Sequence, residues 1–282
     1  MKGDFSRNTF DPLKHFSRVL EQQGRVRVDA DSNEQTAILL YYLRTLVTDL
    51  IGTFAGPKDL NGFEIGEIND GDFTIGEGRY YVDGILCENE KPDNGKNITY
   101  KTQQDYPNPL PLETNRTYLV YLDVWERHIT TLEDDYIREK ALGGPDTASR
   151  AKVVWQVKVE EMKNNNEITC QTIRDSWEND WVNRWQPTNR GSLKARVKPP
   201  EASTDPCLTA PEVKYRGQEN QLYRIEIHKG SKAGKPTFKW SRDNGSVVSR
   251  VLDLTGTELI VEKSIGFEPG IWVELSNNEQ EL

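Results

Sequence analysis

The chain has 282 residues, a formal net charge of −9 and three cysteines, and these totals exclude several classes of protein. The acidic balance argues against a protein that binds nucleic-acid phosphates, which needs clustered Lys and Arg. The odd number and wide spacing of the cysteines argue against a disulfide framework or a structural zinc site. Only 35% of residues are apolar, but 7 Trp, 11 Tyr and 8 Phe still provide material for a core.

The N-terminal sequence shows no recognisable targeting signal. It reads MKGDFSRN, and no apolar run follows the lysine, so no signal peptide is expected. No window approaches the roughly 18 apolar residues that a membrane-spanning helix requires. We therefore expect synthesis in the cytoplasm and no direct membrane span.

Residues 1–17 form a polar segment in which phenylalanines recur at intervals, at Phe5, Phe10 and Phe16. This pattern predicts an extended arm whose aromatic side chains insert into grooves of the same chain or of a neighbour. Residues 19–28 surround Gly24, and Val26 and Val28 alternate with Arg25 and Arg27, which predicts a pair of strands.

One long amphipathic helix is expected over residues 33–51. Ser32 followed by Gln35 fits the capping box at a helix start, and Gly52 suits the residue just after a helix end. Apolar residues then recur at steps of three and four, and we expect Leu39, Tyr42 and Leu46 among them to contact a partner. Residues 29–33 begin like a calcium-binding loop, but the sixth position is not glycine and the twelfth is not glutamate, so no metal site is expected.

The remainder of the chain has the closely spaced turn residues that are typical of a β protein. Asn, Asp and Gly recur every few residues, and Asp83-Gly84 is a hairpin signal. Alternating apolar residues predict strands at 63–65, 73–75, 79–82, 85–87, 98–101, 118–125 and 153–159. Further strands are expected at 221–228, 237–241, 246–252, 258–262 and 271–275, with a hairpin turn at 243–245.

The sequence therefore predicts a mainly β fold of short-stranded sandwich or meander domains, with an N-terminal extended arm and one long amphipathic α-helix. We expect three parts: the arm and helix at 1–56, a β domain at 57–200 and a second β region at 201–282. Because the chain stops in a polar tail soon after a short strand, we expect this second region to continue in a longer parent protein.

Trp177, Trp181 and Trp185 are spaced as on one face of a helix, although the Asp and Asn residues around them and Pro187 argue against a long one. Exposed aromatic rings stack on sugars, so these three residues are candidate ligand-facing aromatics, and a carbohydrate- or surface-binding module is the alternative function.

A hydrolase is a further alternative, and it would require two converging carboxylates, for example from residues 133–135 or 160–161. No phosphate-binding loop, dinucleotide fingerprint, zinc-protease motif or nucleophile elbow occurs in the sequence. We therefore expect no catalytic residues, no cofactor and no enzymatic activity.

Several long stretches resemble an uncharacterised domain family from the gene neighbourhoods of phage-tail-like contractile injection systems. The matching stretches are residues 1–12, 16–35, 73–90, 118–130, 141–159, 219–228 and 238–248. The layout of residues 16–35 and the following helix is also similar to the N-terminal region of phage proteins that attach fibres to baseplates.

The resemblance implies a structural baseplate, fibre or accessory subunit of such a particle, inside the cell or released from it. Its partners would be other subunits of the assembly and further copies of the chain, in a trimer or a six-fold arrangement. Phe5, Phe10 and Phe16 would anchor the arm on a partner, and nucleic acid is not expected as one.

Overall fold

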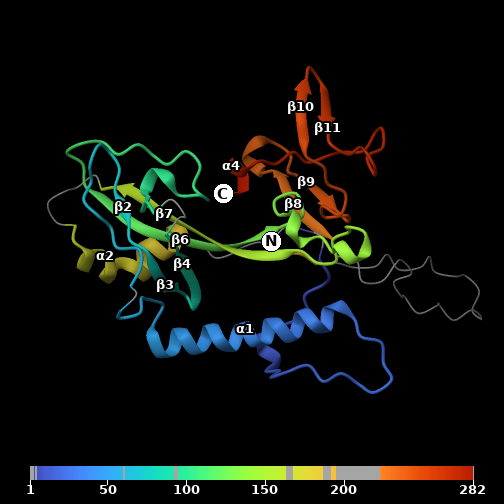
Figure 1. Cartoon of the computed structure of the whole chain (residues 1–282), viewed down its shortest axis with the longest axis horizontal. Coiled ribbons are helices and arrows are strands. Elements are labelled where there is room, and N and C mark those ends of the chain that lie inside the picture. Colours follow the sequence, from blue (N-terminus) through green and yellow to red (C-terminus); the bar gives the residue numbers. More distant parts are fainter. Residues whose placement is uncertain are drawn as a thin grey trace, which may run out of the picture. The chain divides into compact units, whose positions relative to one another are not determined.

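The computed structural model describes residues 3, 5–59, 61–91, 95–162, 168–186, 192–194 and 223–281. These residues form a mainly β fold, as predicted, in which several sheets of two or three strands are accompanied by few helices (Figure 1). The chain divides into two compact units, one made of residues 1–160 and 221–282 and the other of residues 161–220. The expected three-part division at residues 56 and 200 stays a prediction.

The long helix α1 spans Asp29–Ile51 and ends at Gly52, so its end was predicted and its start was not. The capping box at Ser32 and Gln35 is wrong, because the helix begins one turn earlier at the extended residue Val28, which makes no side-chain cap. Asp29 and Asp31 lie in the first turn instead, where the helix dipole favours negative charge. Gln35 accepts a hydrogen bond from the backbone N–H of Val19, at 2.9 Å.

The strand pair predicted for residues 19–28 is also wrong. A turn does form, with Gly24 at φ 70° and the Arg25 N–H donating to the Gln22 carbonyl at 3.2 Å. No strand flanks this turn in the described chain, and Val26 is 88% exposed. A lone two-stranded hairpin with no surface to cover is at best marginally stable in water.

Three short strands near α1 form one antiparallel sheet, in the order β1 (Phe54–Ala55), β3 (Gly78–Val82) and β4 (Ile85–Asn89). Asp83 and Gly84 join β3 to β4 with φ values of 47° and 73°, so the predicted Asp-Gly hairpin is confirmed. A second sheet pairs β2 (Thr74–Ile75) with β5 (Ile98–Thr99). The predicted strand at 63–65 contributes an isolated bridge between Ile65 and Ile75.

The two longest strands, β6 (Tyr118–Ile129) and β7 (Arg150–Glu161), pair with each other. The first extends the predicted strand at its C-terminal end, and the second extends it at both ends. Between them, residues 135–137 and 140–142 form short 3-10 turns. The main core packs around β7, and its buried members are Phe73, Ile75, Tyr100, Val157 and Val159.

A buried glutamine joins this core to the preceding loop. The Gln103 side-chain amide donates to the backbone carbonyls of Tyr100 and Val157, at 2.9 Å and 3.0 Å. Its carbonyl accepts from the Val157 N–H at 2.6 Å. Because buried polar groups must be paired, the Gln103 side chain takes the place of a neighbouring strand and satisfies both backbone groups of Val157 in β7.

The C-terminal region contains two separate hairpins, β8 (Arg224–Lys229) with β9 (Thr237–Ser241), and β10 (Val251–Thr255) with β11 (Glu258–Val261). The turn at 243–245 forms, but it connects the two hairpins and does not close one. The predicted strand at 271–275 is absent, because no neighbouring described strand offers it a ladder. A last helical turn, α4, covers Asn278–Glu281.

The other compact unit contains one continuous helical run. It consists of α2 (Cys170–Ser176), a π-helical turn (Trp177–Trp181) and α3 (Val182–Trp185). The sequence argument against a long helix here is therefore wrong. The run starts from a capping box between Thr169 and Thr172, which offsets the weak helix propensity of the Asp and Asn residues that follow.

Candidate functional site

Helix α1 is fastened to the β structure along one face only. Ala30 and Ile38 are buried, and the guanidinium of Arg44 binds the Glu126 carboxylate of β6 at 2.7 Å and 3.4 Å. The β3–β4 turn approaches the same helix so closely that a Cβ atom on Gly84 would lie 2.5 Å from the Arg44 carbonyl oxygen. These contacts fix which side of α1 faces inward.

The N-terminal arm follows α1 on another side (Figure 1). The Thr9 hydroxyl donates to the Glu34 carboxylate, and the Asn33 amide donates to the Ser6 hydroxyl at 3.0 Å. Further along, the ring of Phe10 packs against Tyr41 with centroids 5.5 Å apart. The arm is thus held by polar contacts to the first turns of α1 and by one aromatic contact near its middle.

Between the arm and α1 lies a groove of about 380 Å³. Its lining comes from both segments and consists of Phe10, Pro12, His15, Phe16, Tyr41, Tyr42, Thr45, Leu46 and Asp49. The walls are mainly aromatic and aliphatic, with His15 and Asp49 as the ionisable members. Such a groove suits an apolar side chain of a partner segment, because shape and desolvation dominate contacts of this kind.

The structure brings four of the six predicted partner-binding residues to this groove, namely Phe10, Phe16, Tyr42 and Leu46. Leu39 lies on α1 but outside the lining, and it is exposed. Phe5 is placed elsewhere, because its ring packs edge-on against His128 of β6 with centroids 5.6 Å apart. Phe5 therefore holds the beginning of the arm on its own chain.

Sequence reasoning missed several apolar residues of α1 that are exposed to solvent. Besides Leu39, Tyr42 and Leu46, these are Leu40, Tyr41, Leu43, Leu50 and Ile51. Their periodicity was visible in the sequence, but a stripe of apolar residues does not say whether it faces the core or a partner. The surface that we call the arm–helix surface comprises the groove lining and these α1 residues.

The candidate ligand-facing tryptophans pack on one another. Trp185 contacts Trp181 with centroids 4.9 Å apart and Trp177 with centroids 5.8 Å apart. The Arg184 guanidinium lies over the Trp181 ring, 4.5 Å from its centroid, in cation–π geometry. All three indoles are half-buried, so they form a compact cluster with partly accessible rings.

The three carboxylates at residues 133–135, one of the two groups considered for a hydrolase, take up local structural roles in the segment after β6, while Glu160 and Glu161 lie at the end of β7. Glu133 accepts hydrogen bonds from the backbone and hydroxyl of Thr130, and Asp134 caps the 3-10 turn through the Tyr136 N–H. Asp135 pairs with Arg138 at 2.6 Å. Nothing in this arrangement aims two carboxylates at a shared point.

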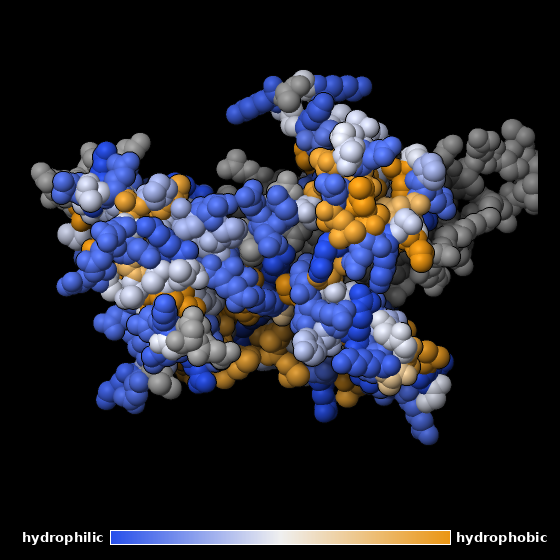
Figure 2. All heavy atoms as spheres, turned by 45° about the horizontal axis from the view of Figure 1, so that its top comes forward, coloured by the Kyte–Doolittle hydropathy of each residue, from blue (hydrophilic) through white to orange (hydrophobic). Residues whose placement is uncertain are grey.

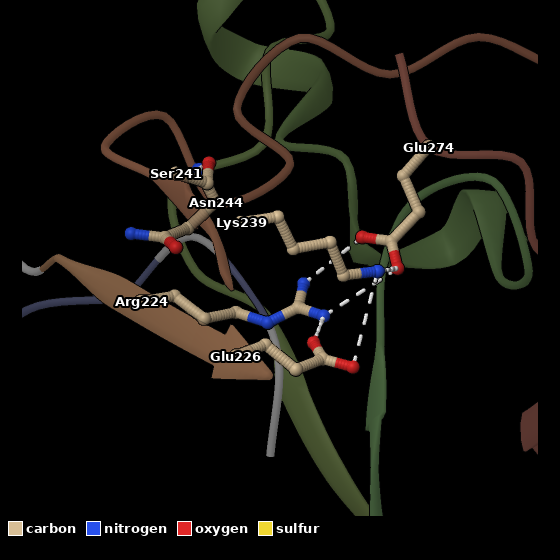
Figure 3. Close-up of polar contacts among 6 residues, drawn as sticks. All are labelled: Arg224, Glu226, Lys239, Ser241, Asn244 and Glu274. Carbon is tan, nitrogen blue, oxygen red and sulfur yellow. Dashed lines mark hydrogen bonds and ion pairs between the residues drawn. The ribbon is translucent and has the colours of Figure 1, made fainter. Parts of the chain in front are cut away.

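The β8–β9 hairpin has one charged face and one apolar face. On the charged face, Arg224 and Lys239 bind Glu226 and Glu274 (Figure 3). Hydrogen bonding from Lys239, and then from Arg224, lowers the pKa of Glu274 despite its partial burial. Burial acts to lower the pKa of Arg224, but its hydrogen bonds to the two glutamates outweigh this and raise it.

The opposite face of the same hairpin is exposed. It presents the cross-strand pairs Ile225 with Trp240 and Ile227 with Phe238. Apolar side chains gather over this region of the surface (Figure 2), so the chain has a second apolar surface besides the arm–helix surface. Nothing in the sequence distinguished this face from an ordinary core face.

The described residues show no group of three or more His, Cys, Asp or Glu arranged to hold a metal ion. Cys87 is buried, and burial raises the pKa of its thiol to about 12, which makes it unreactive. Cys170 is exposed and free, and Cys207 lies outside the described residues. Among the described residues, no helix has the length and apolar character needed to cross a membrane.

Comparison with known proteins identifies a family but no activity. No curated protein and no solved structure matches the chain significantly. Residues 1–179 and 160–259 match a family of unknown function, DUF6519. These segments cover most of the chain, including the arm, α1, the β6–β7 pair, the β8–β9 hairpin and part of the β10–β11 hairpin. The chain belongs to the family DUF6519.

Proposed function

We propose that this chain is a structural subunit of a phage-tail-like contractile injection system, a baseplate, fibre or accessory component without enzymatic activity. The observation that carries the proposal is the arm–helix surface, whose large apolar side chains its own chain leaves uncovered. Extended apolar patches on a soluble chain mark sites of interaction. The stretches that resemble proteins of injection gene clusters supply the identity of the assembly.

Attachment would take place at the groove between the arm and α1. The ring of Phe10 packs against Tyr41 and forms part of the groove on the arm side. Phe16 on the arm and Leu46 on α1 line the two walls of the groove and are exposed. An apolar side chain of a neighbouring subunit fits between them, since aromatic and aliphatic pockets accept such anchors. The subunit would be made in the cytoplasm and then incorporated, with three-fold or six-fold symmetry by analogy with such machines.

The test is incorporation into particles assembled from the whole gene cluster. Deleting residues 1–17 should abolish incorporation while the circular-dichroism spectrum of the purified chain keeps its β signal. A sharper variant is Phe16→Glu, which places a charge in the groove without removing the contacts of Phe5 and Phe10. Its matched control is Leu142→Glu, since Leu142 is equally apolar, 65% exposed and far from α1 in sequence.

Normal incorporation of both the deletion and the Phe16→Glu chain would refute attachment through the arm. Loss of incorporation for Leu142→Glu as well would show that any added charge disturbs assembly, and the groove would lose its special role. Absence of the chain from purified particles would refute the assembly itself.

The tryptophan cluster supports a second candidate, binding of carbohydrate or of a cell surface. Three half-buried indoles lie within contact of one another in the helical run, and aromatic rings stack on sugars. The Arg184 guanidinium lies over both Trp181 and Trp185, 4.5 Å and 5.7 Å from their ring centroids, and Trp185 contacts both other indoles, so its loss would disrupt the whole cluster. Binding to a glycan array that disappears in Trp185→Ala, but not in Tyr136→Ala on an exposed turn, would favour this function.

A further inference from the structure

Four leucines lie on the side of α1 that is turned away from the β structure. They are Leu39, Leu43, Leu46 and Leu50, and they are 59%, 56%, 55% and 76% exposed. With 3.6 residues per turn, these positions fall within one stripe, here called the leucine seam. The buried Ala30 and the ion-paired Arg44 lie roughly opposite it, so the contacts that fix α1 on the β structure hold the seam outward.

The spacing of the seam is that of a coiled coil. Successive leucines are separated by four, three and four residues, which is a heptad pattern with a mean period near 3.5. Such steps also occur on helices that pack against a core, but here the stripe is exposed, which leaves it available to a second helix. We propose that α1 pairs through the leucine seam with α1 of a second copy of this chain, in an antiparallel two-fold contact.

The direction of pairing follows from symmetry and charge. Steps of four, three and four read the same from either end, so a two-fold axis places Leu39 opposite Leu50 and Leu43 opposite Leu46. A parallel pair would bring together the first turns of both helices, each with Asp29 and Asp31. Like charges at close range are unfavourable, and an antiparallel pair separates them while opposing the two helix dipoles.

The flanks of the seam suit the same arrangement. On one flank, Leu40 and Val47 extend the apolar contact toward the equivalent residues of the other copy. On the other flank, Tyr42 of one copy lies near Asp49 of the second, where a phenol O–H can donate to a carboxylate. Both flanks are therefore compatible with an antiparallel contact, and neither presents an unpaired charge to apolar surface.

The area is sufficient for a specific contact. Six large apolar side chains of the seam and its flanks are between 41% and 76% exposed, which amounts to on the order of 500 Å² per copy. Two copies would bury about 1,000 Å², the lower limit for a specific interface. We therefore expect a dimer of moderate affinity, populated at protein concentrations of about 10–100 µM. The inference shares the leucines of α1 with the arm–helix surface, but it goes beyond the proposed function because it names α1 of a second copy as the partner and applies to the chain outside any particle.

The first experiment is light scattering coupled to size-exclusion chromatography on the full chain at about 100 µM. The expected mass is twice the 32.3 kDa of one chain, falling toward a single chain on dilution. Leu43→Glu and Leu46→Glu place charges at the centre of the seam and should give a monomer at every concentration. Since both leucines are exposed in the single chain, thermal unfolding should change little, and Leu142→Glu should leave the dimer intact.

The second experiment fixes the orientation by disulfide trapping in a Cys170→Ser, Cys207→Ser background. Mixing the Leu39→Cys chain with the Leu50→Cys chain should give a cross-linked dimer, and neither chain alone should do so. Cross-linking of Leu39→Cys with itself would show a parallel pair and overturn the antiparallel arrangement.

Two further outcomes would overturn the proposal itself. One is a wild-type chain that stays monomeric at about 100 µM. The other is a dimer that persists in Leu43→Glu and Leu46→Glu, which would place the contact elsewhere, for instance on the apolar face of β8–β9. Neither outcome depends on incorporation into particles, so failure of the pairing and failure of the proposed function are separate results.

Discussion

The turn between β3 and β4 sets the position of α1, and replacing Gly84 by alanine tests this contact directly. Gly84 has φ 73°, and a Cβ atom there would lie 2.5 Å from the Arg44 carbonyl oxygen and 2.7 Å from the Arg44 Cα. Both are backbone atoms of a helix, so they cannot move aside as the end of a flexible side chain would. The turn must therefore retreat from α1 if the alanine is to be accommodated.

The magnitude has two parts. An alanine at positive φ costs about 1–2 kcal/mol, and forcing added bulk into a packed contact costs a further 1–3 kcal/mol or so. Gly143 provides the matched control, because it has φ 88° in the left-handed region and nothing within 4 Å of its added Cβ. Gly143→Ala should lose only the first part, so Gly84→Ala should be less stable by about 1–3 kcal/mol.

The assay is thermal unfolding of the full chain, followed by circular dichroism at a wavelength that reports helix. For a chain of this size, each kcal/mol lowers the midpoint by about 2–4 °C, so the two variants should differ by several degrees. Equal losses in Gly84→Ala and Gly143→Ala would mean that the turn does not press on α1. The outward placement of the leucine seam would then lack its main support.

Three further predictions concern the β structure. Tyr100→Phe should destabilise the chain by about 1 kcal/mol in urea unfolding, because the buried hydroxyl donates to a backbone carbonyl at 2.9 Å; an unchanged midpoint would contradict this bond. Iodoacetamide followed by peptide mass spectrometry should label Cys170 rapidly in the folded chain and Cys87 only after unfolding, since burial raises the pKa of the Cys87 thiol to about 12. Hydrogen bonding from Lys239 lowers the pKa of Glu274 in the folded chain. The ionised Glu274 therefore stabilises the fold at pH values above the pKa of a glutamate in the unfolded chain, about 4.3. This stabilisation disappears as the pH falls through the lower pKa of the folded chain. In Glu274→Gln, the free energy of unfolding should therefore fall less on acidification than in the wild-type chain. The difference should be well under 1 kcal/mol, because the ion pair is largely exposed. An identical pH dependence in the two chains would argue against the ion pair.

The elements that sequence predicted correctly are those whose signal is local or strongly repeated. Asp83-Gly84 favours positive φ at two successive residues, and this requirement is met whatever surrounds the hairpin. The continuous apolar run in β6 and the alternating run in β7 each contain enough β-branched and aromatic residues to specify a strand by themselves. The mainly β class followed from the density of turn residues between such runs.

The errors occur where a strand needs a partner that the sequence does not identify. Residues 25–28 alternate between basic and apolar side chains, and residues 271–275 are apolar except at Glu274, yet neither segment finds a neighbouring strand in the described chain. Near the first, the Val19 N–H donates to the side chain of Gln35; in the second, the Glu274 side chain binds Arg224 and Lys239. A strand forms only with a partner that completes its backbone ladder, and the pattern of side chains does not reveal whether such a partner is present.

The helix α1 shows why a candidate interface is harder to predict than the element that carries it. Its period was evident, and amphipathic helices usually turn their apolar stripe toward the core. Here the inward face combines the buried Ala30 and Ile38 with the half-buried Arg44 and Thr48, while the leucines remain outside. The ion pair of Arg44 with Glu126 adds a polar contact between this face and the β structure. The exposed leucine stripe is therefore available for association, and its spacing is the basis of the proposed pairing with α1 of a second copy.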